Sequence, residues 1–388
     1  MNIKLAARLS LVPPYLFVEV RRKIAEAKSK GIDVISFGVG DPVEATPQEI
    51  IQSLKMNAEN IENHCYPPGE ARGMIAFRKA VADWYEKRFN VMLDPEIEII
   101  TLIGSKEGSH HLALAMINPG DFSIVPDPAY TTYEMSTLFS GGQVYKVPLL
   151  KTNNFLPDLH SIPEDIARKA KLIFINYPNN PTGATATKEF FKNLVDFAYK
   201  WNIVIASDNP YSEITFDGYK APSILELEGA KDIAVEFNSL SKPFNMTGWR
   251  IGMAVGNRDV LGGIKIIKDN TDSGPFAAIQ HAGITALKGY QKFLLPMIKI
   301  YENRRNKLMN VLSKLNLKAQ PPKATFYVWA EITENIKSME FTDNLLNKYG
   351  IVAIPGIGYG KHGEGFVRFS LTVPDHRFDE AMSRIERG

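Results

Sequence analysis

Short apolar runs alternate with helix-like stretches through the middle of the chain, and this alternation constrains the fold more than any other feature. Strands joined by helices form crossover units, which predict a mostly parallel sheet covered by helices on both faces. The runs that predict strands are 98–103, 122–125, 143–147, 172–176, 203–207, 233–238 and 251–255. The stretches that predict helices between several of them are 106–117, 131–139, 158–168 and 187–201.

The pattern changes after about residue 290, where a smaller unit is expected. A long helical stretch over 291–315 is followed by strand-like runs over 326–332 and 366–371, which together predict a small α+β domain. A chain of 388 residues also favours two domains over one. We therefore expect an N-terminal segment over 1–45 packed with the small domain, a large domain over 46–288 and a small C-terminal domain over 289–388.

Composition and charge exclude several classes of protein. The formal net charge of +2 gives no reason to expect a nucleic-acid or membrane-surface partner. Cys65 is the only cysteine and cannot form an internal disulfide. No apolar run reaches the roughly 20 residues that span a bilayer, and the first residues lack the features of a signal peptide. A cytoplasmic protein that binds neither nucleic acid nor membrane is expected.

The strongest chemical motif follows the strand-like run 233–238. Lys242 ends the sequence S-L-S-K, with Ser239 and Ser241 before it and Arg250 in the later G-W-R-I-G. Ligands of open α/β sheets bind beyond the carboxyl ends of the strands, which is where this loop lies. A lysine can form an imine with an aldehyde cofactor, whereas serine hydroxyls and an arginine suit a phosphate. An isolated S-x-S-K would be an ordinary surface loop, but Arg250 favours a site.

This segment resembles the Schiff-base segment of the fold-type I, class I and II aminotransferases, and the resemblance extends in order over essentially the whole chain. It implies an α/β fold of the aspartate aminotransferase type. The large domain would bind pyridoxal 5′-phosphate (PLP) on a mostly parallel seven-stranded sheet between helices, beside a small α+β domain. It also implies that Lys242 holds PLP as a Schiff base and acts as the general base of a transaminase.

Three further loops carry groups that the resemblance assigns to the cofactor ring. Asp208 follows the run 203–207; alone it would be a capping aspartate, but the resemblance implies that it keeps the pyridine nitrogen of PLP protonated. Tyr211 would donate to the phenolic oxygen. Asn180, in the turn N-N-P-T-G, would lie between that oxygen and the substrate carboxylate. Tyr130 would stack on the ring, although aromatic residues are more often core.

The cofactor phosphate has its own expected contacts. Ser105 and Lys106 lie between a strand and a helix in I-G-S-K-E-G, where the N–H groups of a helix start favour an anion. A plain N-cap serine is the competing interpretation. The resemblance gives both residues to the phosphate and adds Tyr66 from the partner subunit, which implies a homodimer with shared active sites.

Arg368 lies inside an apolar strand-like run, where an unpaired charge is costly. The resemblance implies that it binds the α-carboxylate of the amino-acid or 2-oxo-acid substrate, with help from the backbone of Gly40; a structural ion pair is the alternative. His110 and His111 are adjacent and do not share a helix face, so no metal site is expected. The G-x-G-x-x-G at 358–363 precedes a strand, which favours a loop near the substrate over a dinucleotide site.

Segments outside the cofactor motifs resemble LL-diaminopimelate aminotransferases, including A-K-S-K-G-I-D-V-I, F-D-G-Y-K-A-P-S and G-E-G-F-V-R-F-S-L-T. This implies amino transfer between LL-2,6-diaminopimelate and 2-oxoglutarate in lysine biosynthesis. Asn209-Pro210 and Pro243-Phe244 depart from the family pattern in loops that border the substrate. An aspartate, alanine or aromatic aminotransferase stays open, as does a PLP-dependent C–S lyase. A non-catalytic relative is disfavoured by the complete set of cofactor residues.

Overall fold

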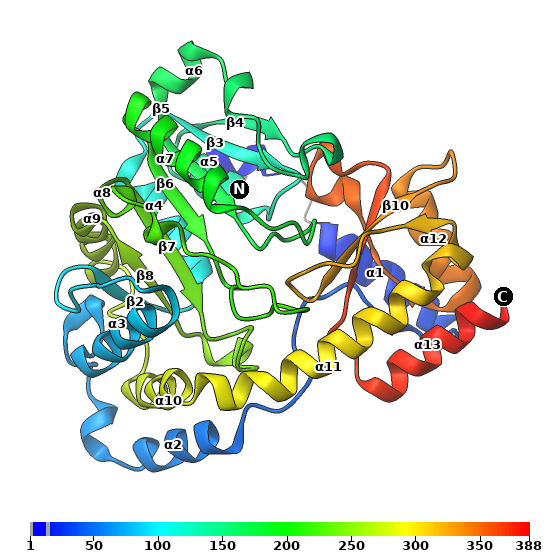
Figure 1. Cartoon of the computed structure of the whole chain (residues 1–388), viewed down its shortest axis with the longest axis horizontal. Helices are drawn as coiled ribbons and strands as arrows, with labels where there is room; N and C mark the ends of the chain where they lie inside the picture. The colour runs from blue at the N-terminus through cyan, green and yellow to red at the C-terminus, as the bar shows by residue number, and fades with distance from the viewer. Residues whose placement is uncertain (1–2, 13–15) are drawn as a thin grey trace.

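A computed structural model of the chain describes residues 3–12 and 16–388, and the larger of its two layers is built around a seven-stranded sheet (Figure 1). Its strands are β2 (Ile99–Leu102), β3 (Phe122–Asp127), β4 (Gln143–Pro148), β5 (Ala170–Asn176), β6 (Val204–Asp208), β7 (Ala234–Ser239) and β8 (Gly252–Gly256). They lie in the order β2-β8-β7-β6-β5-β3-β4. Every neighbouring pair is parallel except the two pairs formed by β8, which runs antiparallel to β2 and β7.

Both faces of this sheet are covered, and successive residues of a strand enter different cores. Ile173 and Ile175 of β5 pack in a core with α3, α7 and α10, whereas Leu172 and Phe174 pack in a core with α4, α5 and α9. This follows from the two-residue period of a strand and explains why these runs are apolar throughout. The helices of this layer are α2 (Gln48–Ala58), α3 (Ile75–Phe89), α4 (Ser105–Met116), α5 (Thr132–Phe139), α6 (Glu164–Lys169), α7 (Lys188–Trp201), α8 (Ala230–Ile233), α9 (Arg258–Asp269) and α10 (Ala277–Lys288).

A smaller layer has a separate core and lies beside the first (Figure 1). Its four-stranded sheet has the order β12-β13-β10-β9, and β1 pairs with β11 in a short parallel ladder. The long helix α11 joins the layers, because Phe293 and Leu294 pack in the larger core and Leu308 in the smaller one. The elements are β1 (Ile35–Ser36), α11 (Tyr290–Val311), β9 (Leu317–Lys318), β10 (Tyr327–Ile332), α12 (Ser338–Tyr349), β11 (Ile351–Val352), β12 (Ile354–Pro355), β13 (Phe366–Ser370) and α13 (Asp375–Arg387).

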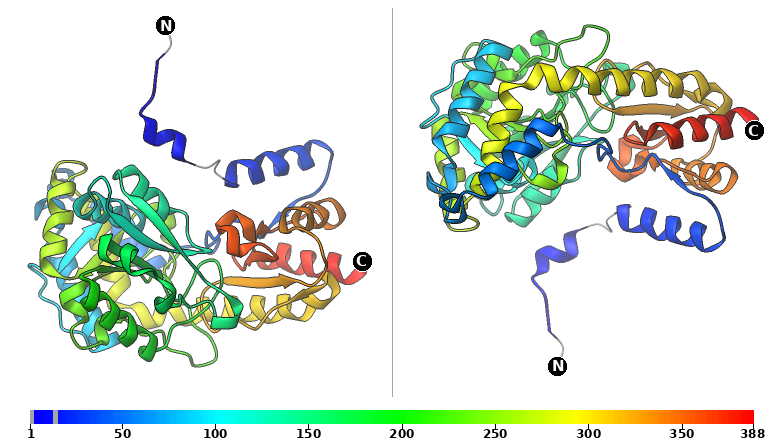
Figure 2. Two further views of the ribbon diagram at one scale, coloured as in Figure 1. Left: turned by 90° about the horizontal axis from the view of Figure 1, so that it is seen from above. Right: turned by 90° about the horizontal axis from the view of Figure 1, so that it is seen from below.

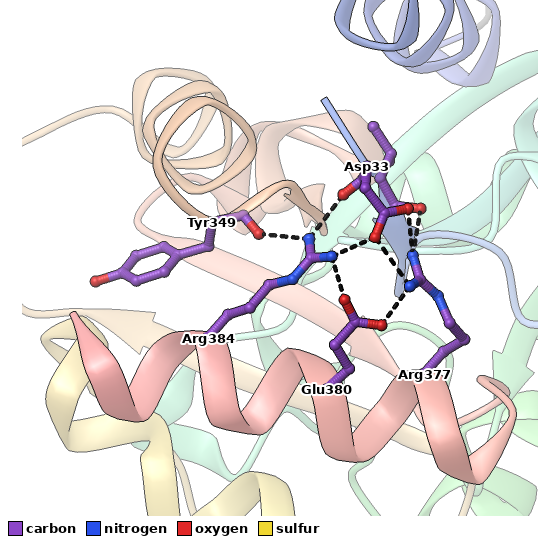
Figure 3. A network of polar contacts seen from close by, with 6 residues as sticks. Asp33, Tyr349, Arg377, Glu380 and Arg384 are labelled. Carbon is purple, nitrogen blue, oxygen red and sulfur yellow. Dashed lines mark hydrogen bonds and ion pairs between the residues drawn. The ribbon is translucent and has the colours of Figure 1, made fainter. Parts of the chain in front are cut away.

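The N-terminal helix α1 (Leu16–Ser29) lies beside the smaller layer (Figure 2). Its Ile24 packs with the buried Leu346 of α12, and Lys23 pairs with Asp343 of the same helix. The segment after α1 is held by a polar network in which Asp33 accepts from arginines of α13 (Figure 3). The first part of the chain is thus attached to the last by both apolar and charged contacts.

The predicted fold class is confirmed, and each predicted strand of the large sheet overlaps an observed one. The helical stretch 291–315 is α11 followed by a 3-10 turn over Leu312–Leu315. Five helices of the large layer, α2, α3, α8, α9 and α10, were not predicted. Residues 1–2 and 13–15 of the expected N-terminal segment lie outside the described residues. No helix in the described part of the chain is long and apolar enough to cross a membrane.

Candidate active site

A cavity of about 440 Å³ opens beyond the carboxyl ends of the central strands, between the two layers. Both layers contribute to its wall, and α1 adds Val20, Arg21 and Ile24. Every site residue named from the sequence except Tyr66 lines it. These residues are Gly40, Ser105, Lys106, Tyr130, Asn180, Asp208, Tyr211, Ser239, Ser241, Lys242, Arg250 and Arg368.

Lys242 lies on the turn that follows β7. The Ser241 N–H donates to Ser239 Oγ at 3.1 Å, which bends the chain away from the sheet. The Lys242 side chain reaches into the cavity, where Nζ donates to the Gly40 carbonyl at 2.7 Å. This acceptor is a neutral carbonyl, and no carboxylate of the described residues pairs with the amine, so it is available to react with a ligand, as a tethering lysine requires.

Asp208 ends β6 and is buried on the cavity floor. Tyr133 donates to its Oδ2 at 2.6 Å, and the Asn176 amide donates to its carbonyl at 2.7 Å. Its other oxygen, Oδ1, accepts no hydrogen bond from the described residues. Burial raises the pKa of Asp208 to about 6, the Tyr133 hydrogen bond opposes this, and the nearby Glu236 adds to it.

The start of α4 and the loop after β7 form a positively charged edge of the cavity. Ser105 and Lys106 begin the helix, where N–H groups and the helix dipole attract an anion. Arg250 approaches this point so closely that a Cβ on Gly104 would lie 2.2 Å from its Nη2. Glycine at position 104, with φ +81°, therefore lets a guanidinium stand beside a helix N-terminus.

Arg368 projects from β13 of the smaller layer and is 2% exposed. Its Nη1 donates to Asn180 Oδ1 at 2.6 Å, and its Nη2 donates to the Gly38 carbonyl at 2.6 Å. The guanidinium also lies 4.1 Å from the ring centre of Tyr327 and 4.9 Å from that of Tyr359. No carboxylate of the described residues pairs with it, so its charge remains available for an anionic ligand.

Tyrosines surround the remaining wall of the cavity. Tyr211 and Tyr327 share a hydrogen bond of 3.2 Å between their hydroxyls. Burial raises the pKa of Tyr211, and Tyr327 raises it further. The Gly40 backbone passes so near that a Cβ there would lie 1.9 Å from the Tyr327 hydroxyl. Tyr130 lies at the positively charged edge of the cavity, with Lys106 Nζ 6.0 Å from its ring centre.

Tyr66 lies away from this cavity and is 87% exposed. It lines a different surface groove together with Glu70 and Asp269. Its assignment to the site of a partner subunit is not tested within one chain and stays a prediction.

The sequence did not single out several residues of the cavity wall. Tyr133 lies three residues after Tyr130, and that spacing at a helix start could have identified it. Tyr327 gave no signal, because an aromatic residue in a buried strand is usually core. Tyr359 lies in the G-x-G-x-x-G loop that was predicted to be near the substrate. Arg21 lies more than 200 positions from Lys242, and no local pattern links them.

His111 belongs to a buried charged cluster behind α4, not to the cavity. Its Nδ1 lies 3.2 Å from Glu107 Oε1, and Asp272 completes a group with the geometry of metal ligands. The fully buried ammonium of Lys268 pairs with both Glu107 and Asp272, so a lysine already supplies the positive charge among these carboxylates.

The cavity residues fit PLP on grounds of their chemistry. Asp208 Oδ1 accepts no hydrogen bond from the described residues, and burial disfavours the anionic form of this carboxyl. The N–H of a pyridinium ring suits such a group, because it supplies both a donor and a positive charge. The helix start beside Arg250 suits a phosphate, and Lys242 Nζ suits an aldehyde. These three groups all line the cavity, in the combination that the cofactor requires.

Comparison with known proteins agrees with this geometry. Residues 32–385 match the family model of the class I and II aminotransferases. The chain is 50% identical to the LL-diaminopimelate aminotransferase of Moorella thermoacetica (98% of this chain, 97% of the relative) and 52% identical to that of Aquifex aeolicus over the same shares. The substrate-bound structure of BacF from Bacillus subtilis superposes with a TM-score of 0.93 at 32% identity, covering 100% of this chain and 98% of BacF. Because the family model matches residues 32–385 and these relatives match nearly the whole chain, the chain belongs to the class I and II aminotransferases, which are PLP-dependent enzymes.

Proposed function

We propose that this aminotransferase moves an amino group between LL-2,6-diaminopimelate and 2-oxoglutarate, as part of lysine biosynthesis. One observation carries the proposal. Over nearly its full length, the chain is about 50% identical to several relatives whose names give that substrate. The cavity supports it, because residues of the larger layer suit PLP and β13 of the smaller layer adds the buried Arg368, which has no carboxylate partner among the described residues.

Each cavity residue then has a role in the transfer. Arg368 binds the substrate α-carboxylate through its guanidinium, with Asn180 fixing the orientation of that group. Lys242 Nζ would tether the cofactor in the resting enzyme. Once displaced, its free amine would take the proton from the substrate Cα and deliver it to the cofactor carbon that had been joined to the lysine. When bound, PLP accepts the electron pair released at Cα. Asp208 holds a proton on the ring nitrogen, and Tyr211 donates to the phenolic oxygen.

The number of cations in the cavity supports substrates with two carboxylates. LL-Diaminopimelate, glutamate and 2-oxoglutarate all carry a second carboxylate beyond the one that Arg368 would bind. With Arg250 and Lys106 at the phosphate and Lys242 at the aldehyde, Arg21 of α1 is a further cation that lines the cavity. If Arg21 meets the second carboxylate of the ligand, its charge favours a dicarboxylate over alanine or an aromatic amino acid.

A donor panel tests the substrate directly. The purified enzyme is incubated with PLP, 2-oxoglutarate and one amino donor at a time, and glutamate is measured. Turnover of LL-diaminopimelate well above that of aspartate, alanine and phenylalanine supports the proposal. Equal or faster turnover of one of those donors contradicts the substrate assignment, and release of ammonia without glutamate from every donor would indicate a lyase.

We also propose a cytoplasmic homodimer in which Tyr66 of each chain serves the active site of the other. Tyr66 is exposed and distant from its own cavity, as that arrangement requires. Apolar side chains close to Tyr66 in the sequence are also exposed, including Met56 and Ile61. The single exposed Cys65 suits a reducing compartment, and fractionation of the native host would locate the enzyme.

We propose the same domain division as above: 1–45 with the small domain, 46–288 as the PLP-binding domain and 289–388 as the small domain. Its support is the distribution of buried residues, since Ile35 and Phe37 pack in the core that contains β10 and β13. Limited proteolysis tests this division: a cut near residue 288 should release a stable fragment.

A further inference from the structure

One side-chain contact joins the two layers at the rim of the cavity. Asp127 ends β3 of the larger layer and is 3% exposed. His362 lies in the loop over 356–363 of the smaller layer, and its Nδ1 lies 2.9 Å from Asp127 Oδ2. The Asp127 carboxylate can only accept a hydrogen bond when ionised, so the His362 Nδ1–H is the donor.

The loop fits closely around this carboxylate. The backbone N–H of His362 donates to Asp127 Oδ1 at 3.3 Å, and the Ala129 N–H donates to the Tyr359 carbonyl at 3.0 Å. A Cβ at Gly360 would lie 1.8 Å from Asp127 Oδ1, and the φ of +139° there also requires glycine. The backbone N–H and the imidazole of His362 therefore both contact the buried carboxylate of Asp127.

The same loop carries a residue of the cavity wall. The Tyr359 ring is buried, lines the cavity, and lies 4.9 Å from the guanidinium carbon of Arg368. Trp329 of β10 packs against it edge to face, with ring centres 6.2 Å apart. A shift of the 356–363 loop would move Tyr359 away from Arg368 and open the carboxylate site to water.

We propose that His362 is a positioning residue: its bond to Asp127 holds the 356–363 loop, and with it Tyr359, against the carboxylate-binding guanidinium of Arg368. The inference rests on the proposed role of Arg368 in binding substrate. His362 touches neither the cofactor wall nor the reacting atoms, and it acts by keeping the carboxylate site closed. Loss of the His362 side chain should therefore weaken the binding of every substrate that presents a carboxylate to Arg368, and by the same factor.

The test compares His362→Ala with His362→Asn and with the control His376→Ala, which changes an exposed histidine of α13. KM and kcat are measured in the holoenzyme for the amino donor and for 2-oxoglutarate. In His362→Ala both KM values should rise about 10-fold, the loss expected for one hydrogen bond to a charged group. Because the loop contact acts on ground and transition states alike, kcat should change by less than about twofold.

A second readout needs no turnover. Amide hydrogen exchange over 356–363 should become faster in His362→Ala and stay unchanged in His376→Ala. The His362→Asn amide can donate from nearly the same position as Nδ1, so it should recover most of the KM and most of the exchange protection. In an Asp127→Asn background the effect of His362→Ala on KM should shrink, since the two residues act as one pair.

Unchanged KM values and unchanged exchange in an active His362→Ala enzyme would overturn the inference. So would a fall in kcat at constant KM, or equal defects in the alanine and asparagine variants. These outcomes are separate from failure of the proposed function, which would be shown by a wild-type enzyme that forms no glutamate from any donor.

Discussion

At the scale of single residues, the cavity is defined by polar groups that lack ordinary partners. Asp208 keeps one oxygen without a donor among the described residues, and Arg368 has no carboxylate beside it. Such groups destabilise a folded chain when buried, so they are retained for a ligand that satisfies them. Both therefore mark where the cofactor and the substrate carboxylate bind.

Asp208 should make the stability of the apoenzyme depend on pH. Its folded pKa of about 6 lies above the value of about 3.9 for an unfolded chain, so the folded state binds the extra proton between those values. The contribution of this group to the free energy of unfolding should then fall as pH rises from about 4 to 6, by up to about 3 kcal/mol. Urea unfolding of apo wild type and apo Asp208→Asn across this range measures it.

The asparagine variant is nearly the same size and does not titrate, so the difference between the two proteins isolates Asp208. Its PLP affinity should also fall, because an amide holds a pyridinium less strongly than a carboxylate does. Parallel pH curves for the two apoenzymes would contradict the burial of an ionisable Asp208.

At the scale of elements, the position of α4 depends on the buried cluster behind it. Lys268 of α9 is fully buried and pairs with Glu107 in the first turn of α4, next to the predicted phosphate contacts. Lys268→Ala should lower the free energy of unfolding by about 3–5 kcal/mol, because it leaves two partly buried carboxylates without a counter-charge. Denaturant unfolding of the apoenzyme measures this loss.

Lys265→Ala on the same helix is the matched control. Its ammonium pairs with the exposed Glu70, and the loss should be about 0–1 kcal/mol. Equal losses in the two variants would show that the Lys268 cluster does not secure α4 to α9.

Local sequence predicted the elements that carry their own signal and missed those whose position depends on distant contacts. The strands around Asp208 and Lys242 were predicted because apolar runs end there in polar loops. The antiparallel direction of β8 was not, since an apolar run has no direction. Tyr359 reaches Arg368 only through the folded loop, and Arg21 reaches the cavity only because α1 packs on α12.

At the scale of the whole molecule, the cavity lies between the two layers. The long helix α11 runs from the larger layer to the smaller one (Figure 1). The proposed dimer adds a second level, in which one chain completes the site of the other. Mixing of subunits tests this: co-expression of Lys242→Ala with Tyr66→Ala should give heterodimers with one intact site. With random pairing, half of the dimers carry one such site, so about a quarter of wild-type activity should return.

Each variant expressed alone provides the baseline for that experiment. If Tyr66 serves its own chain, no site in the mixed dimer is intact, and activity in the mixture should not exceed the average of the two homodimers. That result would remove Tyr66 from the active site of the partner.

The most direct measurement of the central claim is the activity and absorption spectrum of Lys242→Ala with PLP, beside the control Lys220→Ala on an exposed loop. Lys242 Nζ is both the tether and the base, so transamination should be abolished and the absorption of the protonated imine should disappear. Lys220→Ala should match the wild type in both. Near-normal glutamate formation by Lys242→Ala would contradict the assignment of this lysine and the mechanism built on it.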